Sequence, residues 1–195
     1  LRRLLHRWEH DYDWRDFESR LNAHPQFLTE IDGVDIHFVH VRSPHPGALP
    51  LILTHGWPSS VIDFLRLIGP LTDPVAYGGS ADDAFDVVIP SLPGFGFSGK
   101  PAETGWTVDR IADAWVELMH RLGYRSWAAQ GGDWGGAVTS ALGEKRPDGL
   151  VGVHLNTPYA FPQTPPAHLS PAEQHAMDTL AFYSSLAHCG VDVAL

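Results

Sequence analysis

The sequence contains very little cysteine and no cluster of basic residues. A single cysteine, Cys189, occurs among 195 residues, which excludes an internal disulfide framework and the paired cysteine spacing of zinc sites. This usage suits a reducing compartment, so we expect a cytoplasmic protein. The formal net charge is -10, with 13 Lys and Arg against 23 Asp and Glu. Nucleic acids and anionic membrane surfaces are therefore poor candidates for partners.

Long apolar runs are absent as well. No stretch approaches the roughly 20 apolar residues that cross a bilayer, and no signal-peptide pattern opens the chain. We therefore expect no membrane span. Hydrophobic residues are nevertheless abundant, at 44% of the total with seven Trp. A chain of this length and composition is typical of a globular domain with a substantial core.

The first of three regions, residues 1–45, is polar and aromatic. Asp13 is a candidate N-cap for a helix that carries Trp14, Phe17 and Leu21 on one face, and we expect these three side chains to be buried. The stretch "FLTEIDGVDIHFVHVR" (27–42) then predicts a β-hairpin with its turn at Asp32-Gly33. Its second strand alternates imperfectly between apolar and polar residues. We therefore expect an N-terminal extension of helix and hairpin.

The second region, residues 46–158, alternates strands with helices. Four apolar runs are typical of strands buried on both faces of a parallel sheet. These runs are "LPLILTHG" (49–56), "FDVVIPSLPG" (85–94), "RSWAAQG" (125–131) and "GLVGVHLN" (149–156). The spacing predicts helices from Ser59 or Ser60 through Leu67, over 107–122 and over 134–145. The pattern predicts an α/β fold, a mostly parallel sheet with helices on both faces. The third region, residues 159–195, is a Pro-rich linker followed by a helix from about Ser170.

The stretch "GGDWGG" (131–136) contains the pattern small–x–nucleophile–x–small, with Asp133 at its centre. This pattern makes a sharp turn between a strand and a helix, and it lifts the central side chain to the edge of the sheet where α/β proteins bind ligands. It also places the N–H of Trp134 at a helix N-terminus, facing any developing negative charge. The alternative is that Asp133 only caps the helix. A cap, however, does not need glycines at 131, 132, 135 and 136.

A second motif, "HGWP" (55–58), directly follows the first buried strand. In the α/β-hydrolase arrangement this loop supplies the other oxyanion donor, here the N–H of Trp57. His55, Gly56 and Pro58 form the supporting loop, and we interpret His55 as a hydrogen-bonding support rather than a base. An aspartate also suits attack on a saturated carbon, because a carboxylate is ionised at neutral pH and needs no general base.

Together these motifs resemble epoxide hydrolases of the α/β-hydrolase superfamily. The resemblance rests on residues 55–58, "PSLPGFGFSGKP" (90–101) and residues 131–136. The opening stretch 12–43 and "VGVHLNTP" (151–158) are similar to the microsomal and juvenile-hormone branch. The resemblance implies a detoxifying enzyme with Asp133 as nucleophile and the N–H groups of Trp57 and Trp134 as oxyanion hole. Its substrates would be a small apolar epoxide and water, with no cofactor and no metal.

The same resemblance implies lid tyrosines, a charge-relay acid and a histidine base in a cap and in later strands. No tyrosine or histidine of residues 154–195 matches those motifs, and we assign no role to Tyr159, Tyr183, His154, His168, His175 or His188. We therefore expect the chain to be the N-terminal portion of such a hydrolase, ending early. An early end would leave an apolar sheet edge exposed, so we also expect self-association.

Two other functions fit the same motifs. A haloalkane dehalogenase also uses an aspartate followed by Trp at this turn. The length of the N-terminal extension and the Trp of residues 55–58 favour the epoxide hydrolase. The non-enzymatic alternative is a catalytically inactive truncated fragment, or a binding module that keeps only the fold.

Overall fold

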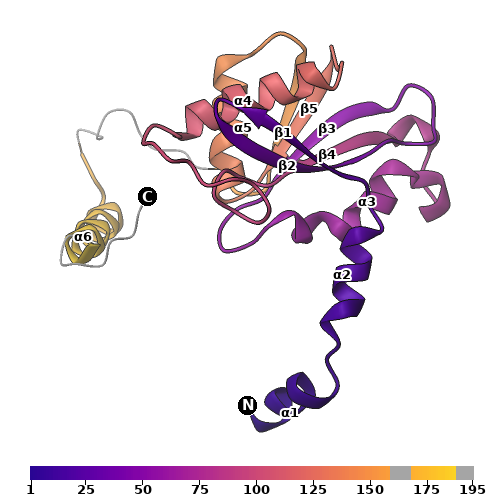
Figure 1. Cartoon of the computed structure of the whole chain (residues 1–195). Helices are drawn as coiled ribbons and strands as arrows, with labels where there is room; N and C mark the ends of the chain where they lie inside the picture. Colours follow the sequence, from indigo (N-terminus) through magenta and orange to yellow (C-terminus); the bar gives the residue numbers. More distant parts are fainter. Residues whose placement is uncertain (159–167, 188–195) are drawn as a thin grey trace. The chain divides into compact units, whose positions relative to one another are not determined.

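In a computed structural model of the protein, which describes residues 1–158 and 168–187, a six-stranded sheet organises most of the chain (Figure 1). Its strands follow the order β1-β2-β4-β3-β5-β6. They are β1 Gln26–Ile31, β2 Val34–Val41, β3 Leu49–Thr54, β4 Phe85–Pro90, β5 Trp127–Gly131 and β6 Leu150–Leu155. The pairs among β4, β3, β5 and β6 are parallel. The predicted strands of residues 46–158 are all present.

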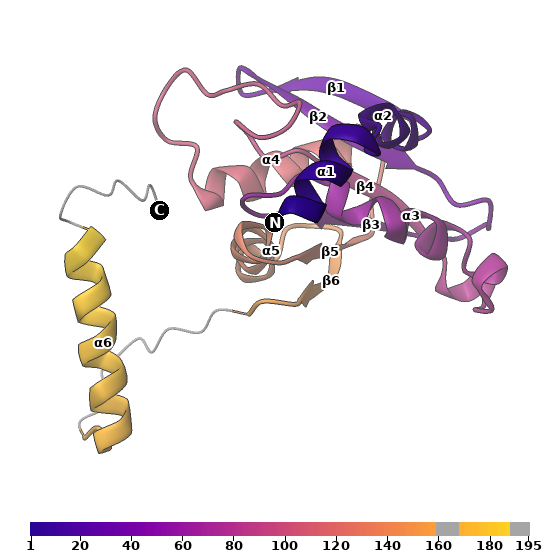
Figure 2. The ribbon, with the colours of Figure 1, turned by 90° about the horizontal axis from the view of Figure 1, so that it is seen from below.

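Helices lie on both faces of this sheet (Figures 1 and 2). The α-helices are α1 Arg2–His10, α2 Trp14–Asn22, α3 Leu65–Thr72, α4 Val108–Arg121, α5 Trp134–Lys145 and α6 Pro171–Ala187. In the part of the chain that the structure describes, the 3-10 helices are η1 Val61–Phe64, η2 Pro74–Tyr77 and η3 Ala81–Asp83. Helices α4 and α5 pack on one face and α3 on the other. The predicted α/β class is confirmed.

Strands β2, β3 and β4 have buried side chains on both faces, so they separate two core layers. The expected burial of residues 149–156 on both faces is wrong, because β6 has no fully buried residue. Ile52, Val88 and Ala129 belong to the layer under α4 and α5, which also holds the fully buried Trp115. Their neighbours along the strands point the other way, toward α3, and form a second layer. Its strand residues are Val39, Leu51, Leu53, Val87 and Ile89. Its helix residues are Leu21, Val61, Phe64 and Ile68. Alternation with a period of two explains why these strands read as continuous apolar runs.

The predicted hairpin is present, and it extends the sheet rather than standing apart from it. Strands β1 and β2 pair antiparallel around the turn at Asp32-Gly33, and β2 then pairs antiparallel with β4. Ile36 and Phe38 enter one core layer and Val39 enters the other. Because both faces of β2 are buried, its apolar and polar residues cannot alternate regularly.

The expected burial of the α2 face is only partly right. Asp13 caps the helix by accepting a hydrogen bond from the Arg15 N–H at 2.9 Å, and Leu21 is 7% exposed. Trp14, however, is 51% exposed, and its ring lies 3.8 Å from the guanidinium carbon of Arg15. Phe17 is half-buried. Leu21 is therefore the side chain through which α2 joins the core.

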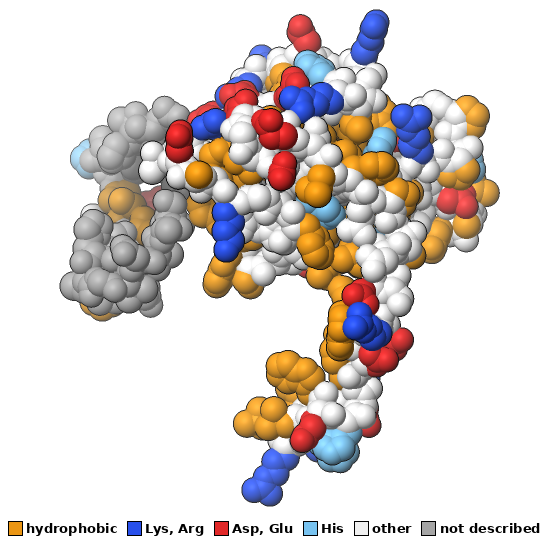
Figure 3. Space-filling model, in the orientation of Figure 1, with side chains coloured by type: hydrophobic (Ala, Val, Ile, Leu, Met, Phe, Trp, Pro, Cys, Tyr) orange, Lys and Arg blue, Asp and Glu red, His pale blue; other side chains and the backbone are white. Residues whose placement is uncertain are grey.

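Helix α1 was not anticipated from the sequence. None of its residues is buried, and its hydrophobic side chains are exposed, as Figure 3 shows over this helix. The sequence nevertheless contains a signal for this helix, because Leu1, Leu4, Leu5 and Trp8 have the i, i+3, i+4, i+7 spacing of an amphipathic helix.

The helix expected to end at Leu67 begins as a 3-10 turn and continues further. Ser60 caps η1 by accepting from the Ile62 N–H, and α3 extends to Thr72. Ile68 and Thr72 lie on its buried side, one turn apart, and the Thr72 hydroxyl donates to the Ile68 carbonyl at 2.8 Å. Burial of this face carries the helix past the predicted end.

The chain divides into two compact units, residues 1–159 and 160–195. In the second, α6 begins directly after Ser170, as predicted. The Glu173 carboxylate accepts from the Ser170 N–H at 2.8 Å and the Ser170 hydroxyl accepts from the Glu173 N–H at 3.3 Å, which is a capping box. Among residues 1–158 and 168–187, no helix combines the length and the apolar character that a membrane span requires.

The burial of α2 leads to a stability prediction. Leu21→Ala should lower the free energy of unfolding by about 2–5 kcal/mol, because it empties a buried site in the core layer under α3. Phe17→Ala, at a half-buried position on the same helix, is the matched control and should cost less. Urea denaturation followed by circular dichroism measures both. A larger loss for Phe17→Ala than for Leu21→Ala would contradict this account of how the extension is anchored.

Candidate functional site

Asp133 occupies a strained turn between β5 and α5. Its backbone has φ 56° and ψ -127°, a region that residues with a side chain rarely adopt. The residue is exposed, and its side chain makes no hydrogen bond that caps α5. The simple helix-cap interpretation therefore lacks the bond that defines a cap. A strained, exposed carboxylate is instead what the nucleophile turn requires.

The glycines around Asp133 allow backbone segments to approach closely. A Cβ on Gly131 would collide with the carbonyl oxygen of Gly135, and one on Gly135 would collide with the carbonyl oxygen of Thr54. At Gly136 a Cβ would come within 3.0 Å of the Thr157 carbonyl oxygen. The close approach expected from the sequence is confirmed. It presses the start of α5 against the end of β3.

The loop of residues 55–58 meets the carboxylate of Asp133. The N–H of Trp57 donates a hydrogen bond to Oδ1 of Asp133 at 2.7 Å. A Cβ on Gly56 would collide with that same oxygen, so only glycine lets the peptide lie against the side chain. The Trp57–Pro58 peptide bond is cis. Trp57 is 67% exposed. This pair of loops holds one carboxylate oxygen through a backbone N–H.

His55 is buried and has both ring nitrogens engaged. The N–H of Leu92 donates to Nε2 at 3.1 Å, so the ring hydrogen is on Nδ1, which donates to the Gly56 carbonyl at 3.1 Å. Burial lowers the pKa of His55, against smaller opposing effects of the Gly56 bond and the charge of Asp63. A neutral histidine with no free nitrogen is unsuited to act as a base and well suited to hold the loop.

The Gly56 carbonyl and the Trp57 N–H belong to the same peptide unit. The carbonyl accepts from His55 and also from the Ser59 N–H at 3.0 Å, while the N–H points to Asp133. Because a peptide unit is planar, fixing its carbonyl fixes the direction of its N–H. His55 therefore orients the donor that contacts Asp133.

Sequence reasoning missed Asn156, which follows β6. Its side-chain oxygen lies so close to Gly132 that any Cβ there would collide with it. Asn156 thus packs against the strained turn from the neighbouring strand and explains the second glycine of residues 131–136. The available signal was an amide residue at the end of the predicted strand 149–156.

The other residues considered from the sequence lie elsewhere or cannot be placed. Trp134 is the first residue of α5, so its N–H is at the helix N-terminus, and its role stays a prediction. His154 is exposed on β6, and His168 and His175 are exposed in the second unit. Tyr159, His188, Cys189 and the side chain of Tyr183 lie outside the described residues.

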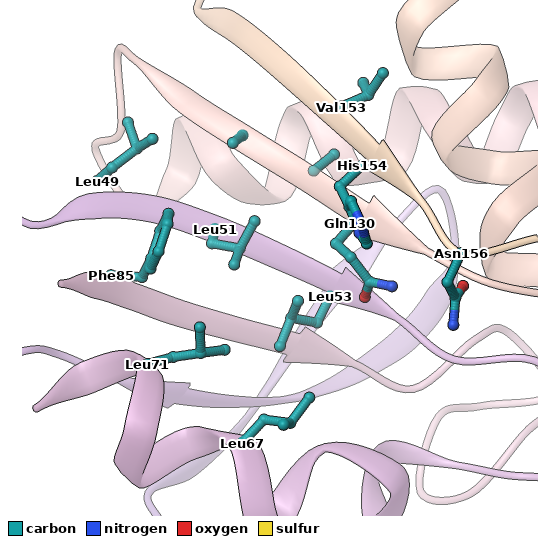
Figure 4. Close-up of a pocket in the computed structure, with 12 residues that line it drawn as sticks. Leu49, Leu51, Leu53, Leu67, Leu71, Phe85, Gln130, Val153, His154 and Asn156 are labelled. Carbon is teal, nitrogen blue, oxygen red and sulfur yellow. The ribbon is translucent and has the colours of Figure 1, made fainter. Parts of the chain in front are cut away.

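A separate apolar groove of about 610 Å³ lies beside α3, on the sheet face opposite α4 and α5 (Figure 4). Leu51, Leu53 and Leu71 form its apolar part, and Gln130, His154 and Asn156 form a polar end. Asp133 is not among the residues that line it. The groove is uncovered core surface of the sheet, and it is not the space in front of the carboxylate.

Comparison with known proteins decides the family. Residues 50–185 match the model of the alpha/beta hydrolase fold, and residues 1–64 match that of the epoxide hydrolase N terminus. The chain belongs to the alpha/beta hydrolase fold family. The first match covers more than half of the chain, and the second covers the extension with its hairpin. The resemblance to epoxide hydrolases is therefore confirmed.

Two relatives of this alpha/beta hydrolase are named as epoxide hydrolases. Epoxide hydrolase 1 of Oryctolagus cuniculus is 41% identical over 160 residues, which are 80% of this chain and 35% of that protein. A protein of Stigmatella aurantiaca (strain DW4/3-1), itself provisionally named an epoxide hydrolase, is 58% identical over 178 residues, 91% of this chain and 40% of that protein. The chain thus spans 35% to 40% of the length of these two relatives.

The fold is shared with solved structures of the same kind. The crystal structure of juvenile hormone epoxide hydrolase from the silkworm Bombyx mori matches with a TM-score of 0.70 at 37% sequence identity. That match covers 78% of this chain and 40% of the silkworm chain. The predicted α/β-hydrolase fold is confirmed.

The buried histidines predict how stability depends on pH. Burial lowers the pKa of His37, His40 and His55 below 6.5 in the folded state. The unfolded chain then binds more protons, so the free energy of unfolding should be highest above about pH 7. It should decrease as the pH falls through 6.5 toward the lowered values, by at most about 1.4 kcal/mol per pH unit for each histidine.

Urea midpoints at pH 7.5 and pH 5.5 measure this effect. His55→Asn, which can still donate to the Gly56 carbonyl but does not titrate, should show a smaller difference between the two midpoints. A wild-type midpoint that stays constant or rises on acidification would show that these histidines do not become protonated on unfolding.

Proposed function

We propose that Asp133 is the nucleophile of an epoxide hydrolase reaction. The observation that carries the proposal is the 2.7 Å hydrogen bond from the Trp57 N–H to Oδ1 of a strained, exposed aspartate. Because Oδ1 is held by this donor, Oδ2 is the oxygen left to attack. The names of the relatives, epoxide hydrolases of mammals and insects, support an epoxide as the substrate.

In the first step Oδ2 of Asp133 attacks a ring carbon and the bond from that carbon to the ring oxygen breaks. The alkoxide takes a proton from an acid, and the product is an ester of Asp133 with Oδ1 as its carbonyl oxygen. A carboxylate needs no base for this step. An apolar epoxide would suit the loop that contacts Asp133, because this loop carries the exposed aromatic residue Trp57.

In the second step water attacks the ester carbonyl and negative charge develops on Oδ1. The N–H of Trp57 already donates to this atom, and the N–H of Trp134 at the start of α5 would be the second donor. Removing one such donor in other hydrolases costs about 2.7–4 kcal/mol of transition-state stabilisation. The step also needs a base to activate water. His55 cannot serve, because both of its nitrogens are occupied.

The two half-reactions should therefore separate in this chain. Incubation with a styrene-oxide-type epoxide should slowly add the mass of the epoxide to Asp133, with diol formation near background. Asp133→Asn should abolish the label, because an amide is a far weaker nucleophile than a carboxylate. Peptide mass spectrometry locates the label, and circular dichroism checks the fold of the variant.

Asp148→Asn, which removes an exposed carboxylate away from the turn, is the matched control and should be labelled like the wild type. Label on a histidine or on Cys189, and never on Asp133, would remove the nucleophile assignment. Halide release from a matched haloalkane, without labelling by the epoxide, would favour the dehalogenase reaction instead.

We also propose that the chain self-associates through β6. This strand ends the sheet order of the described residues, Val151 on it is 61% exposed, and the apolar groove adjoins it. An exposed apolar edge strand pairs readily with another chain. Light scattering over a wide concentration range should show association that Val151→Lys reduces. A monodisperse monomer at all concentrations would contradict the proposal.

A further inference from the structure

His37 on β2 is almost completely buried, at 5% exposure, yet it faces polar groups on both sides. Its Nε2 lies 3.0 Å from Oε1 of Gln26 on β1, and its Nδ1 lies 3.0 Å from the hydroxyl of Ser91. Neither charge nor metal binding accounts for this position. Packing alone would be satisfied by an apolar side chain at this position. The two hydrogen bonds therefore need an explanation of their own.

The partners fix which ring nitrogen carries the hydrogen. The Gln26 amide nitrogen donates to the Leu21 carbonyl and to Oδ1 of Asn22, both at 3.3 Å, so the oxygen of this amide faces His37. That oxygen can only accept, and Nε2 of His37 therefore donates. Nδ1 is then the acceptor, and the Ser91 hydroxyl donates to it.

Ser91 begins the loop of residues 91–99 and is held to β2 by further bonds. Its N–H donates to the His37 carbonyl at 2.8 Å, and its carbonyl accepts from the Ser98 hydroxyl at 2.7 Å. The Ser98 oxygen in turn accepts from the His37 N–H at 3.0 Å. Both the side chain and the backbone of His37 therefore set the position of Ser91.

Leu92, the residue after Ser91, links the position of Ser91 to the site around Asp133. The Leu92 N–H donates to Nε2 of His55, whose Nδ1 donates to the carbonyl of the peptide that points its N–H at Asp133. The series thus runs from Gln26 in β1 through His37, Ser91 and Leu92 to His55 and the Trp57 N–H. All its members up to His55 are at least partly buried, so water cannot replace these bonds without cost.

We propose that His37 is a positioning residue for the oxyanion donor, acting through Ser91 and His55, so that the N-terminal hairpin is part of the catalytic scaffold. The proposal rests on the proposed role of the Trp57 N–H at Asp133. It gives the hairpin a function beyond extending the sheet. The bond to Ser91, and not the bond to Gln26, is the one that reaches the site.

Two substitutions of His37 separate these bonds. In His37→Asn the side-chain oxygen reaches the place of Nδ1 and can accept from Ser91, but the Gln26 bond is lost. In His37→Gln the amide nitrogen reaches the place of Nε2 and can donate to Gln26, but the Ser91 bond is lost. Ser91→Ala also removes the second bond and should behave like His37→Gln.

The first measurement is the rate at which a styrene-oxide-type epoxide labels Asp133 at pH 7.5. His37→Gln and Ser91→Ala should lose about tenfold in rate, as expected for one buried hydrogen bond, while His37→Asn restores most of it. His40→Asn is the structural control. His40 lies three residues further along β2 and bonds to the Tyr124 hydroxyl, so its loss should lower the urea midpoint without changing the labelling rate.

The second measurement needs no chemistry at Asp133. Amide hydrogen exchange of Leu92 and Trp57 should be faster in His37→Gln and Ser91→Ala than in His37→Asn at matched stability. Equal exchange and equal labelling in the Asn and Gln variants would overturn the proposal and leave His37 a packing residue. If the exchange rates differ as expected but the wild type is never labelled at Asp133, the positioning role stands and the proposed nucleophile fails.

Discussion

The hydrogen bond between the Trp57 N–H and Asp133 depends on the register of two neighbouring strands. Strands β3 and β5 are parallel, and Thr54 pairs with Gly131 at their carboxyl ends. The loops that follow therefore start at the same level, and glycines let them touch. An aspartate in this backbone conformation costs roughly 1–3 kcal/mol. A hydrogen bond to a charged acceptor contributes about 1.5–3 kcal/mol, which offsets a cost of that size.

The surrounding core holds both loops from the side of α4. Trp115 on this helix is fully buried, and its indole N–H donates to the Thr54 hydroxyl at 3.0 Å. Gly135 at the start of α5 packs on the carbonyl of the same Thr54. Thr54, at the end of β3, therefore contacts both α4, through Trp115, and the first turn of α5, through Gly135. The strained turn is held by packing that is complete before any substrate arrives.

The local motifs could be predicted from the sequence because each depends on residues close together along the chain. Residues 131–136 specify their own turn, and the apolar runs specify strands. His37 could not be predicted in the same way, because Ser91, its partner, lies 54 residues away. The exposure of Trp14 on α2 could not be predicted either. Its spacing fits an apolar face, but its ring contacts Arg15 rather than the core. Periodicity shows which residues share a face and not what covers that face.

The two buried histidines of this scaffold have opposite tautomers, with the hydrogen on Nε2 in His37 and on Nδ1 in His55. Each tautomer is required by a partner that can only accept or only donate. Adding a proton to His55 would place two donors face to face at Leu92, and burial already disfavours the charge. His55 therefore stays neutral, with both ring nitrogens bonded. The neutral ring fixes the Gly56–Trp57 peptide, and this peptide directs its N–H at Oδ1 of Asp133.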